Sequence, residues 1–256
     1  MTMSDAFGGF RRKLTGGGRL LGSFIKTPSV HATEILSDLG FDFVVVDEEH
    51  GPFDRTSIDL LMLAANATGI AGIVRVAGKA SILSALDMGA AGIIAPRVND
   101  AEQARDIVAA SHYLGGERGC SPSPRAGRYG ALGLADHVAC ADAGMSVTVM
   151  IEHPDAVRNV EAIAAVEGVD ALFMGLGDLA VASGELSPGA PSIRLAAEQI
   201  SAAARRHGKG LIATSPSVEA GSWLIELGVH AFVVASDQGL MRSAAMRQLS
   251  DFRALG

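Results

Sequence analysis

The sequence predicts an α/β fold, a single (β/α)8 barrel over residues 1–256. Three observations predict this fold class. Short runs of β-branched and apolar residues recur eight times along the chain, and segments with a helical spacing of apolar residues separate them. Alternating strands and helices are typical of a parallel sheet covered by helices. Eight such units in a chain of this length favour closure of the sheet into a barrel.

Each expected strand is too short to be a typical helix. The strands are expected at residues 20–25, 41–47, 72–76, 92–96, 146–152, 171–175, 210–214 and 231–236. The helices are expected at residues 29–39, 58–65, 101–111, 154–166, 193–207, 217–227 and 239–252. Gly40, Gly89 and Gly228 each follow an acidic and an apolar residue, a pattern typical of helix C-caps that lead into the next strand.

An open, doubly wound sheet would carry a Gly-x-Gly-x-x-Gly turn after its first strand. Here the first strand runs into Lys26-Thr27-Pro28, which favours the barrel.

One connection is unusually long, and its first part, residues 115–130, is rich in glycine and contains Arg118, Arg125 and Arg128. Long loops on the functional face of a barrel commonly contribute to sites, so we expect this segment to lie there and to shape a ligand pocket. Its arginines are equally compatible with ordinary surface charges.

Composition excludes several classes of protein. The net charge is −7, and no basic block exceeds three residues, so the chain has no electrostatic footprint for nucleic acid. The first ten residues lack the basic start and apolar run of a secretory signal, and no segment reaches a transmembrane length. We therefore expect a cytoplasmic protein without a membrane partner, in which Cys120 and Cys140 are free thiols.

Charged residues gather where the predicted strands end. The second strand ends in Asp47-Glu48-Glu49-His50, the third carries Arg75, the fifth ends in Glu152 and the sixth runs into Asp178. Since the inside of a parallel barrel is packed with apolar side chains, charges at the carboxyl ends of its strands indicate an active site.

Glu152 and Asp178 follow neighbouring strands and are expected to converge above the barrel. Like charges placed so close together need a cation, and oxygen ligands completed by water and substrate suit Mg²⁺ or Mn²⁺. The alternative is that each carboxylate only caps a helix.

His50 and Arg75 complete the expected site. His50 follows an apolar strand and titrates near neutrality, which is typical of a general base, although a lone histidine is often only a surface residue. Arg75 lies within an apolar strand, where a buried guanidinium needs an anionic partner. We expect that partner to be an oxyanion of the substrate.

Four short sequence motifs together indicate a family. They are residues 41–50, Val74-Arg75-Val76, Ile151-Glu152 and residues 175–179, with sequence Gly-Leu-Gly-Asp-Leu. They resemble the HpcH/HpaI family of class II pyruvate aldolases, and the match extends over nearly the whole chain. The resemblance implies a TIM barrel of the phosphoenolpyruvate/pyruvate type with an N-terminal helix. It also implies an aldehyde-lyase that cleaves 4-hydroxy-2-oxo acids into pyruvate, or a close analogue, and an aldehyde through a metal-bound enolate.

The resemblance also implies roles for single residues. Glu152 and Asp178 match the family's metal ligands, with Mg²⁺ or Mn²⁺ expected, Co²⁺ possible and no organic cofactor. Arg75 matches the arginine that stabilises the oxyanion, and His50 matches the general base. Gly177, with Gly175 in the same turn, matches the backbone that contacts the substrate carboxylate. Asp47 belongs to the motif of the general base and is counted with the catalytic residues.

Asp87 matches an aspartate that raises the basicity of the histidine. Because it precedes a strand, it is expected at the bottom of the barrel, too far from its own His50. It could meet the histidine of a neighbouring subunit, in agreement with the family's often hexameric assembly, a trimer of dimers.

The sequence departs from the family pattern at three positions: Glu48 replaces the usual Gly, Leu176 the usual Pro, and Met150 a Gln that commonly contacts substrate. These changes leave the chemistry intact but affect substrate choice, and they open the donor pocket to hydroxypyruvate as well as pyruvate.

Two other functions stay open. A lyase acting on a CoA thioester, of the citryl- or malyl-CoA type, shares the barrel and its metal carboxylates, but such chains usually carry a longer C-terminal segment. A non-catalytic protein that binds a 2-oxo acid is the other alternative, and His50 and Asp87 argue against it because binding alone needs no general base.

Overall fold

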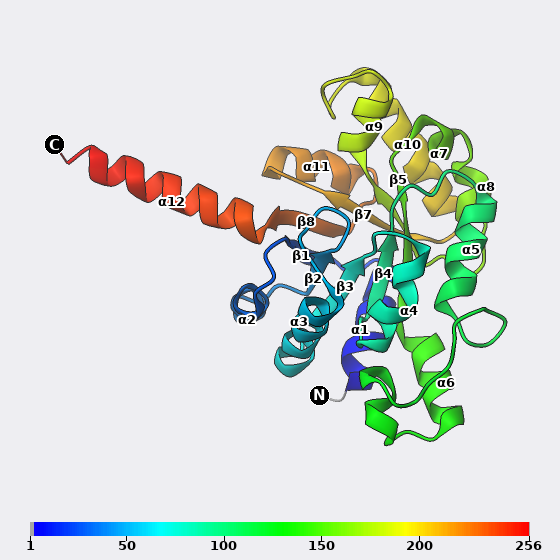
Figure 1. The fold of residues 1–256 in the computed structure, drawn as a ribbon. Helices are drawn as coiled ribbons and strands as arrows, with labels where there is room; N and C mark the ends of the chain where they lie inside the picture. The colour runs from blue at the N-terminus through cyan, green and yellow to red at the C-terminus, as the bar shows by residue number, and fades with distance from the viewer. Residues whose placement is uncertain (1–2, 256) are drawn as a thin grey trace.

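The computed structural model describes residues 3–255, and its eight strands form one closed parallel barrel (Figure 1). Each strand pairs with the next along the chain, and β1 closes the barrel on β8. The strands are β1 (Leu20–Ile25), β2 (Phe43–Asp47), β3 (Ala71–Arg75), β4 (Gly92–Ala95), β5 (Ser146–Ile151), β6 (Ala171–Met174), β7 (Gly210–Thr214) and β8 (Ala231–Ser236). The predicted (β/α)8 fold is confirmed, and the strand bounds differ from the predicted ones by at most two residues.

Helices surround the barrel. They are α1 (Met3–Thr15), α2 (Val30–Asp38), α3 (Arg55–Thr68), α4 (Lys79–Asp87), α5 (Ala101–Ser111), α6 (Leu134–Gly144), α7 (Pro154–Arg158), α8 (Val160–Ala164), α9 (Leu176–Ala182), α10 (Pro191–Arg206), α11 (Val218–Glu226) and α12 (Asp237–Arg253), with a 3-10 turn, η1, at Arg125–Gly130. The glycines predicted to end helices adopt the left-handed conformation, with φ of 87° at Gly40, 91° at Gly89 and 90° at Gly228.

Some helices were not predicted correctly. The expected helix over 154–166 is two short helices, because Asn159 leaves helical geometry at φ −100° and ψ 6°. Its side chain instead donates to the backbone carbonyl of Asn99 across 2.9 Å. Helices α4, α6 and α9 fall outside the predicted ranges, because they are short or lack a strong apolar stripe.

The alternation of side chains along each strand divides the core into two parts. Residues such as Val45, Ile73 and Phe173 point into the barrel, whereas Val44 and Val74 pack outward against the helices. Phe43 fills the barrel so tightly that a Cβ at Gly22 would lie 2.4 Å from its ring. Apolar packing therefore leaves polar groups room only at the two ends of the barrel.

Helix α1 covers the amino end of the barrel. Its Phe10 and Leu14 belong to the interior cluster. Arg11 Nε donates to Asp170 Oδ1 across 3.0 Å, just before β6, and the ring of His230 contacts the carbonyl oxygen of Leu14 at 2.6 Å, just before β8. The N-terminal helix implied by the resemblance is thus present, and it leaves the carboxyl ends of the strands open.

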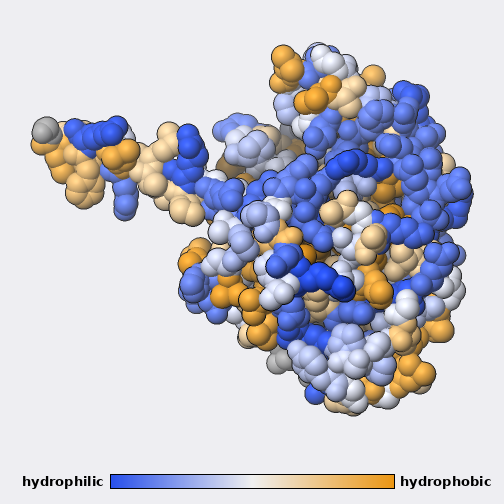
Figure 2. Space-filling model, viewed as in Figure 1, coloured by the Kyte–Doolittle hydropathy of each residue, from blue (hydrophilic) through white to orange (hydrophobic). Residues whose placement is uncertain are grey.

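Helix α12 behaves differently from the helices that cover the barrel. It projects away from the globule, and none of its residues is buried (Figure 1). Figure 2 shows hydrophobic residues along it beside hydrophilic ones. The exposed apolar side chains include Leu240, Met241, Leu249 and Phe252.

The position predicted for residues 115–130 is wrong. They connect the end of α5 to the start of β5, a connection that approaches the amino ends of the strands. Arg118 donates to Asp87 at the end of α4 across 2.9 Å, and Arg125 binds Asp59 on α3. Figure 1 shows the α6 region that follows beside α1, away from the open end of the barrel. This segment therefore does not shape the site built by its own chain's strand ends.

Candidate active site

Asp47 and Arg75 form a buried ion pair at the end of β2 and β3. The parallel register places the two residues directly beside each other. Arg75 Nε lies 2.9 Å from Asp47 Oδ1, and Nη2 lies 2.7 Å from Oδ2. The expectation that Arg75 has a substrate oxyanion as its partner is therefore corrected: Asp47 offsets the cost of burying the guanidinium, and any bound oxyanion adds to this pair.

Lys26, which the sequence analysis did not single out, also belongs to this group. Lys26 directly follows β1, and its Nζ lies 3.0 Å from Asp47 Oδ2. Burial raises the pKa of Asp47, but the hydrogen bonds and charges of Arg75 and Lys26 outweigh it and hold that pKa below its ordinary value. Asp47 therefore holds two cations in place at the end of the barrel.

Glu49 connects the ion pair to His50. Its Oε2 lies 3.5 Å from Nη1 of Arg75 and 3.8 Å from Nε2 of His50, while its Oε1 accepts from Arg97. The His50 backbone N–H donates to Asp47 Oδ1 at 3.2 Å, and the ring itself is half exposed. His50 thus presents a ring at the rim of the barrel, held by its backbone and open to a ligand.

Glu48, the residue that replaces the family's Gly, has a structural role. Its Oε2 accepts from the backbone N–H of Ala77, and its Oε1 accepts from the hydroxyl of Ser81 in the first turn of α4. A carboxylate at a helix N-terminus is favoured by the free N–H groups and the helix dipole. Both carboxylate oxygens of Glu48 are therefore already bound by the protein.

Glu152 lies at the end of β5 and is buried. Its Oε1 accepts a hydrogen bond from the backbone N–H of Arg97 at 2.6 Å. Burial is the main cause that raises the pKa of Glu152, and the charges of Asp178 and Glu49 raise it further. The neighbouring β6 ends in Gly175, where a Cβ would lie 2.5 Å from the Glu152 Cβ, so only glycine allows this approach.

Asp178 lies in the first turn of α9 and is exposed. One alternative was that Glu152 and Asp178 serve only as helix N-caps. In the part of the chain that the structure describes, the N-cap residues of α7 and α9 are instead His153 and Gly175. Gly177 is exposed, and an added Cβ there would meet nothing within 4 Å, so its backbone is open to a ligand. Met150 lies inside the barrel with its methyl group toward Gly175.

The donor set at Glu152 and Asp178 fits a hard divalent cation. Both ligands would be carboxylate oxygens, the donors that hard divalent cations prefer, and a cation between them would offset the repulsion of their like charges. Residues 3–255 contain no cluster of three or more His, Cys, Asp or Glu side chains arranged for a metal. A site built on two carboxylates would therefore take its remaining ligands from water and substrate, as Mg²⁺ commonly does.

Asp87 lies at the end of α4, before β4, at the opposite end of the barrel from His50. There it accepts a hydrogen bond from Arg118 Nη2, and the Arg118 guanidinium stacks on the ring of Tyr113 at 4.2 Å. The expected separation of Asp87 from its own His50 agrees with this placement. A contact with another subunit's histidine stays a prediction.

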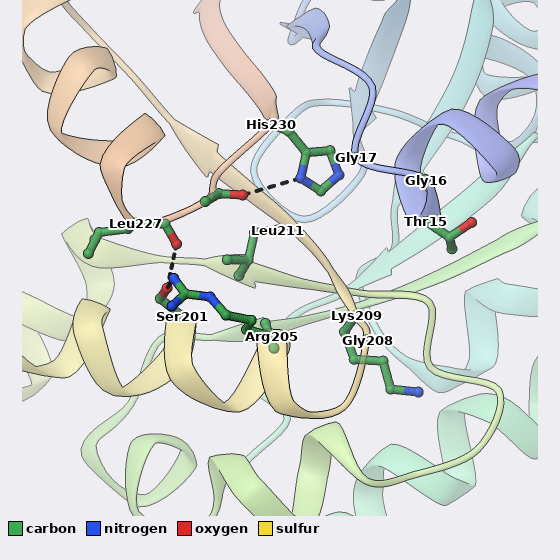
Figure 3. A pocket seen from close by; sticks show the side chains of 12 residues that line it. Thr15, Gly16, Gly17, Ser201, Arg205, Gly208, Lys209, Leu211, Leu227 and His230 are labelled. Carbon is green, nitrogen blue, oxygen red and sulfur yellow. Dashed lines mark hydrogen bonds between the residues drawn. The ribbon is translucent and has the colours of Figure 1, made fainter.

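A pocket of about 300 Å³ lies between the ends of α1, α10 and α11, near the amino ends of β7 and β8 (Figure 3). Its basic side chains already have partners: Lys209 Nζ donates to the carbonyls of Val166 and Val169, and His230 contacts Leu14. The free carbonyls of helix C-termini also make this region unfavourable for anions. The carboxylate cluster at the other end of the barrel is therefore the better candidate active site.

The comparisons with known proteins agree with this geometry. The model of the HpcH/HpaI aldolase/citrate lyase family matches residues 20–244, which include every strand of the barrel. The chain belongs to this family. It is similar to a 5-keto-4-deoxy-D-glucarate aldolase of Klebsiella pneumoniae, with 37% identity over 226 residues that cover 87% of this chain and 88% of the relative.

Two solved structures give the same result. A family member from Burkholderia cenocepacia superposes with a TM-score of 0.91 at 27% identity, covering 96% of this chain and 99% of the other. The citrate synthase SbnG superposes with a TM-score of 0.87 at 30% identity, covering 96% and 98%. The chain is therefore an enzyme of the lyase class that acts on carbon–carbon bonds. Among the described residues, no helix is both long and apolar enough to cross a bilayer.

The structure brings most of the predicted family site together. Asp47, Arg75, Glu152 and Asp178 lie at one end of the barrel with His50, while Asp87 lies at the other. Sequence reasoning missed Lys26, Glu49 and Arg97. All three follow predicted strands within two residues, which was the available signal. The partners of Arg97 could not be predicted, because its side-chain direction depends on an unusual backbone conformation.

Proposed function

We propose that this family member is a metal-dependent aldolase that reversibly cleaves 4-hydroxy-2-oxo acids into pyruvate or hydroxypyruvate and an aldehyde. The observation that carries the proposal is the carboxylate pair Glu152 and Asp178 beside Arg75 and the open ring of His50. A chelating 2-oxo acid needs a cation for its keto and carboxylate oxygens, a positive charge for the developing oxyanion, and a base.

Glu152 and Asp178 would hold the cation, Mg²⁺ or Mn²⁺, which as a Lewis acid lowers the energy of an enolate. Arg75 stabilises the negative charge that develops on the keto oxygen, and Asp47 fixes the orientation of its guanidinium. The exposed backbone at Gly177, in the first turn of α9, favours the substrate carboxylate.

In the cleavage direction, His50 accepts the proton of the 4-hydroxyl group. The bond between C3 and C4 then breaks, the aldehyde carbonyl forms at C4, and the electron pair stays on the three-carbon fragment as an enolate. The protonated His50 then donates a proton to the C3 carbon, which gives pyruvate. Addition is the reverse of these steps, so no oxidant or reductant is required.

The substrate class that we propose is a 2-oxo diacid. The aldolase from Klebsiella pneumoniae is named for 5-keto-4-deoxy-D-glucarate, which carries a carboxylate at each end. Retro-aldol cleavage of such a diacid places one carboxylate on pyruvate and the other on the aldehyde. We propose the same division of charge for the substrate of this chain.

The donor pocket is proposed to accept hydroxypyruvate as well as pyruvate. Met150 presents a methyl group beside Gly175 at a position where the family usually has Gln, so this chain places no amide there. Comparing turnover of the two donors with one aldehyde tests this proposal. Turnover with pyruvate alone would reject it.

A lyase that acts on a CoA thioester is the second candidate. The observation that favours it is the similarity to SbnG, a citrate synthase. Saturable turnover of a citryl- or malyl-CoA thioester, with no reaction of free oxo acids, would establish this alternative.

We also propose that the chain forms a homo-oligomer through α12. The helix leaves its own barrel, and its apolar residues Met241, Ala245, Leu249 and Phe252 recur at the spacing of one helix face. Leu21 on β1 and the end of β8, beside the base of α12, stay partly exposed. A second copy that exchanges its α12 would cover apolar surface on both chains. The hexamer, a trimer of dimers, stays a prediction.

The decisive experiment is exchange of the pyruvate methyl protons in D2O, followed by NMR with Mg²⁺, with Mn²⁺ and with EDTA. Metal-dependent exchange that is lost in Glu152→Ala and His50→Ala is the expected result. Glu48→Gln is the matched control, because this carboxylate lies at the same end of the barrel but binds the start of α4. Absence of exchange with every metal would contradict the proposed function.

A further inference from the structure

Arg97 has an unusual backbone at the open end of the barrel. Its φ is 58°, and it is one of three non-glycine residues with positive φ in the described chain. Such a conformation is unfavourable for a residue other than glycine and persists where the surroundings enforce it. Here it directs the backbone N–H to Glu152 Oε1 at 2.6 Å. In the same conformation the Arg97 side chain extends toward Glu49.

The Arg97 guanidinium is only partly used by the protein. Its Nε and Nη2 both donate to the same oxygen, Glu49 Oε1, at 3.1 and 2.7 Å. Within residues 3–255, Nη1 has no hydrogen-bond partner, and the side chain is 71% exposed. A guanidinium has five N–H donors arranged to bind carboxylates, so this one keeps donors for a ligand.

Arg97 lies beside Glu152, a proposed metal ligand, and carries a positive charge. A guanidinium keeps its proton in proteins, so Arg97 is cationic at every relevant pH. Two other cations beside the strand ends, Arg75 and Lys26, are both bound to Asp47. Arg97, in contrast, is an exposed cation beside the proposed donor site.

We propose that Arg97 recognises the carboxylate of the aldehyde half of the substrate. The inference rests on the proposed aldolase function: the donor half occupies Glu152, Asp178 and Arg75, and the aldehyde carbon must lie next to it for the new bond to form. The free edge of the Arg97 guanidinium then binds the carboxylate at the far end of that aldehyde. Arg97 thus selects aldehydes that carry a carboxylate, and it takes no part in proton transfer.

The test compares two acceptors of equal carbon number, glyoxylate, which carries a carboxylate, and glycolaldehyde, which does not. Pyruvate is the donor, and kcat/KM is measured for wild type, Arg97→Met and Arg97→Lys. A charge-assisted hydrogen bond contributes about 1.5–3 kcal/mol, which corresponds to a loss of roughly 10- to 100-fold. We expect that loss for glyoxylate in Arg97→Met, an intermediate loss in Arg97→Lys, and a change below about 3-fold for glycolaldehyde.

Arg206→Met is the matched control, because Arg206 is also ion-paired, to Glu161, and is 64% exposed, but lies at the amino end of the barrel. Equal losses for both acceptors in Arg97→Met would overturn the proposal, since they would show that Arg97 only holds Glu49 and Glu152 in place. Unchanged kinetics with glyoxylate would overturn it too.

Two measurements separate this proposal from the proposed function. Exchange of pyruvate methyl protons involves no acceptor, so it should persist in Arg97→Met, and its absence in wild type would count against the aldolase function itself. Broadening of the NMR signal of the carbon-13-labelled glyoxylate carboxylate reports binding without turnover. Broadening by wild type that Arg97→Met loses supports the proposal, and broadening that the variant retains, or that wild type lacks, overturns it.

Discussion

Asp47 binds Arg75 through two hydrogen bonds of 2.9 and 2.7 Å at the carboxyl end of the barrel, and both side chains are buried. The register of β2 and β3 makes this pair almost unavoidable, since the two residues are direct neighbours. The same carboxylate also holds Lys26 at 3.0 Å. Asp47 is therefore the anion on which the positive part of the site is built.

Removal of the Asp47 charge should destabilise the protein more than removal of the Arg75 charge. Asp47→Asn leaves Arg75 buried with only Glu49 at 3.5 Å, and breaking such a pair costs about 3–5 kcal/mol. Arg75→Met leaves Asp47 with Lys26 and should cost roughly half as much. Urea unfolding of both variants checks the order, and an equal or reversed order would contradict the role assigned to Lys26.

The contribution of Asp47 to stability should depend on pH in one direction. Its pKa in the folded protein is below its ordinary value, whereas in the unfolded chain it is about 3.9. The stabilisation is therefore complete above about pH 5 and is lost as the pH falls through the folded pKa. The difference in unfolding free energy between wild type and Asp47→Asn should be constant from pH 5 to 7 and should shrink below pH 4. A difference that grows on acidification would refute this assignment.

Alanine substitutions at two glycines of the same turn should have different effects on the unfolding free energy. A Cβ at Gly175 would lie 2.5 Å from that of Glu152, so Gly175→Ala must displace the proposed metal ligand and should cost about 1–3 kcal/mol. Gly177→Ala adds its methyl group to open space inside α9 and should leave the unfolding free energy unchanged or slightly raised. Thermal unfolding and Mn²⁺ binding by isothermal calorimetry test the pair. Undiminished Mn²⁺ binding in Gly175→Ala would argue against Glu152 as a ligand.

A charge on the apolar face of α12 should disrupt assembly. Leu249→Glu places a carboxylate where the proposed exchange buries an apolar side chain, so we expect a smaller species by light scattering coupled to gel filtration. Ser250→Glu is the matched control, since it adds the same charge one residue later, on the opposite face of α12. A monomeric wild type, or equal effects of the two changes, would be inconsistent with assembly through this face.

The barrel and most of its site could be predicted from the sequence. Eight apolar runs separated by helical segments leave few other arrangements, because parallel strands need crossover helices and the carboxyl ends of such strands meet at one face. Asp47, His50, Arg75, Glu152 and Asp178 could be named from their positions at or near strand ends. Their convergence follows directly from the topology.

The partners of the charged side chains could not be predicted, because they depend on how the folded chain packs. The register of β2 and β3 assigned Asp47 to Arg75, where the sequence had indicated a substrate oxyanion. The φ of 58° at Arg97 determined that its N–H binds Glu152 while its side chain binds Glu49. The course of residues 115–130 toward the amino end, and of α12 away from the barrel, likewise depends on contacts between distant segments. Local pattern carries no information about such contacts, because side-chain partners are set by three-dimensional packing.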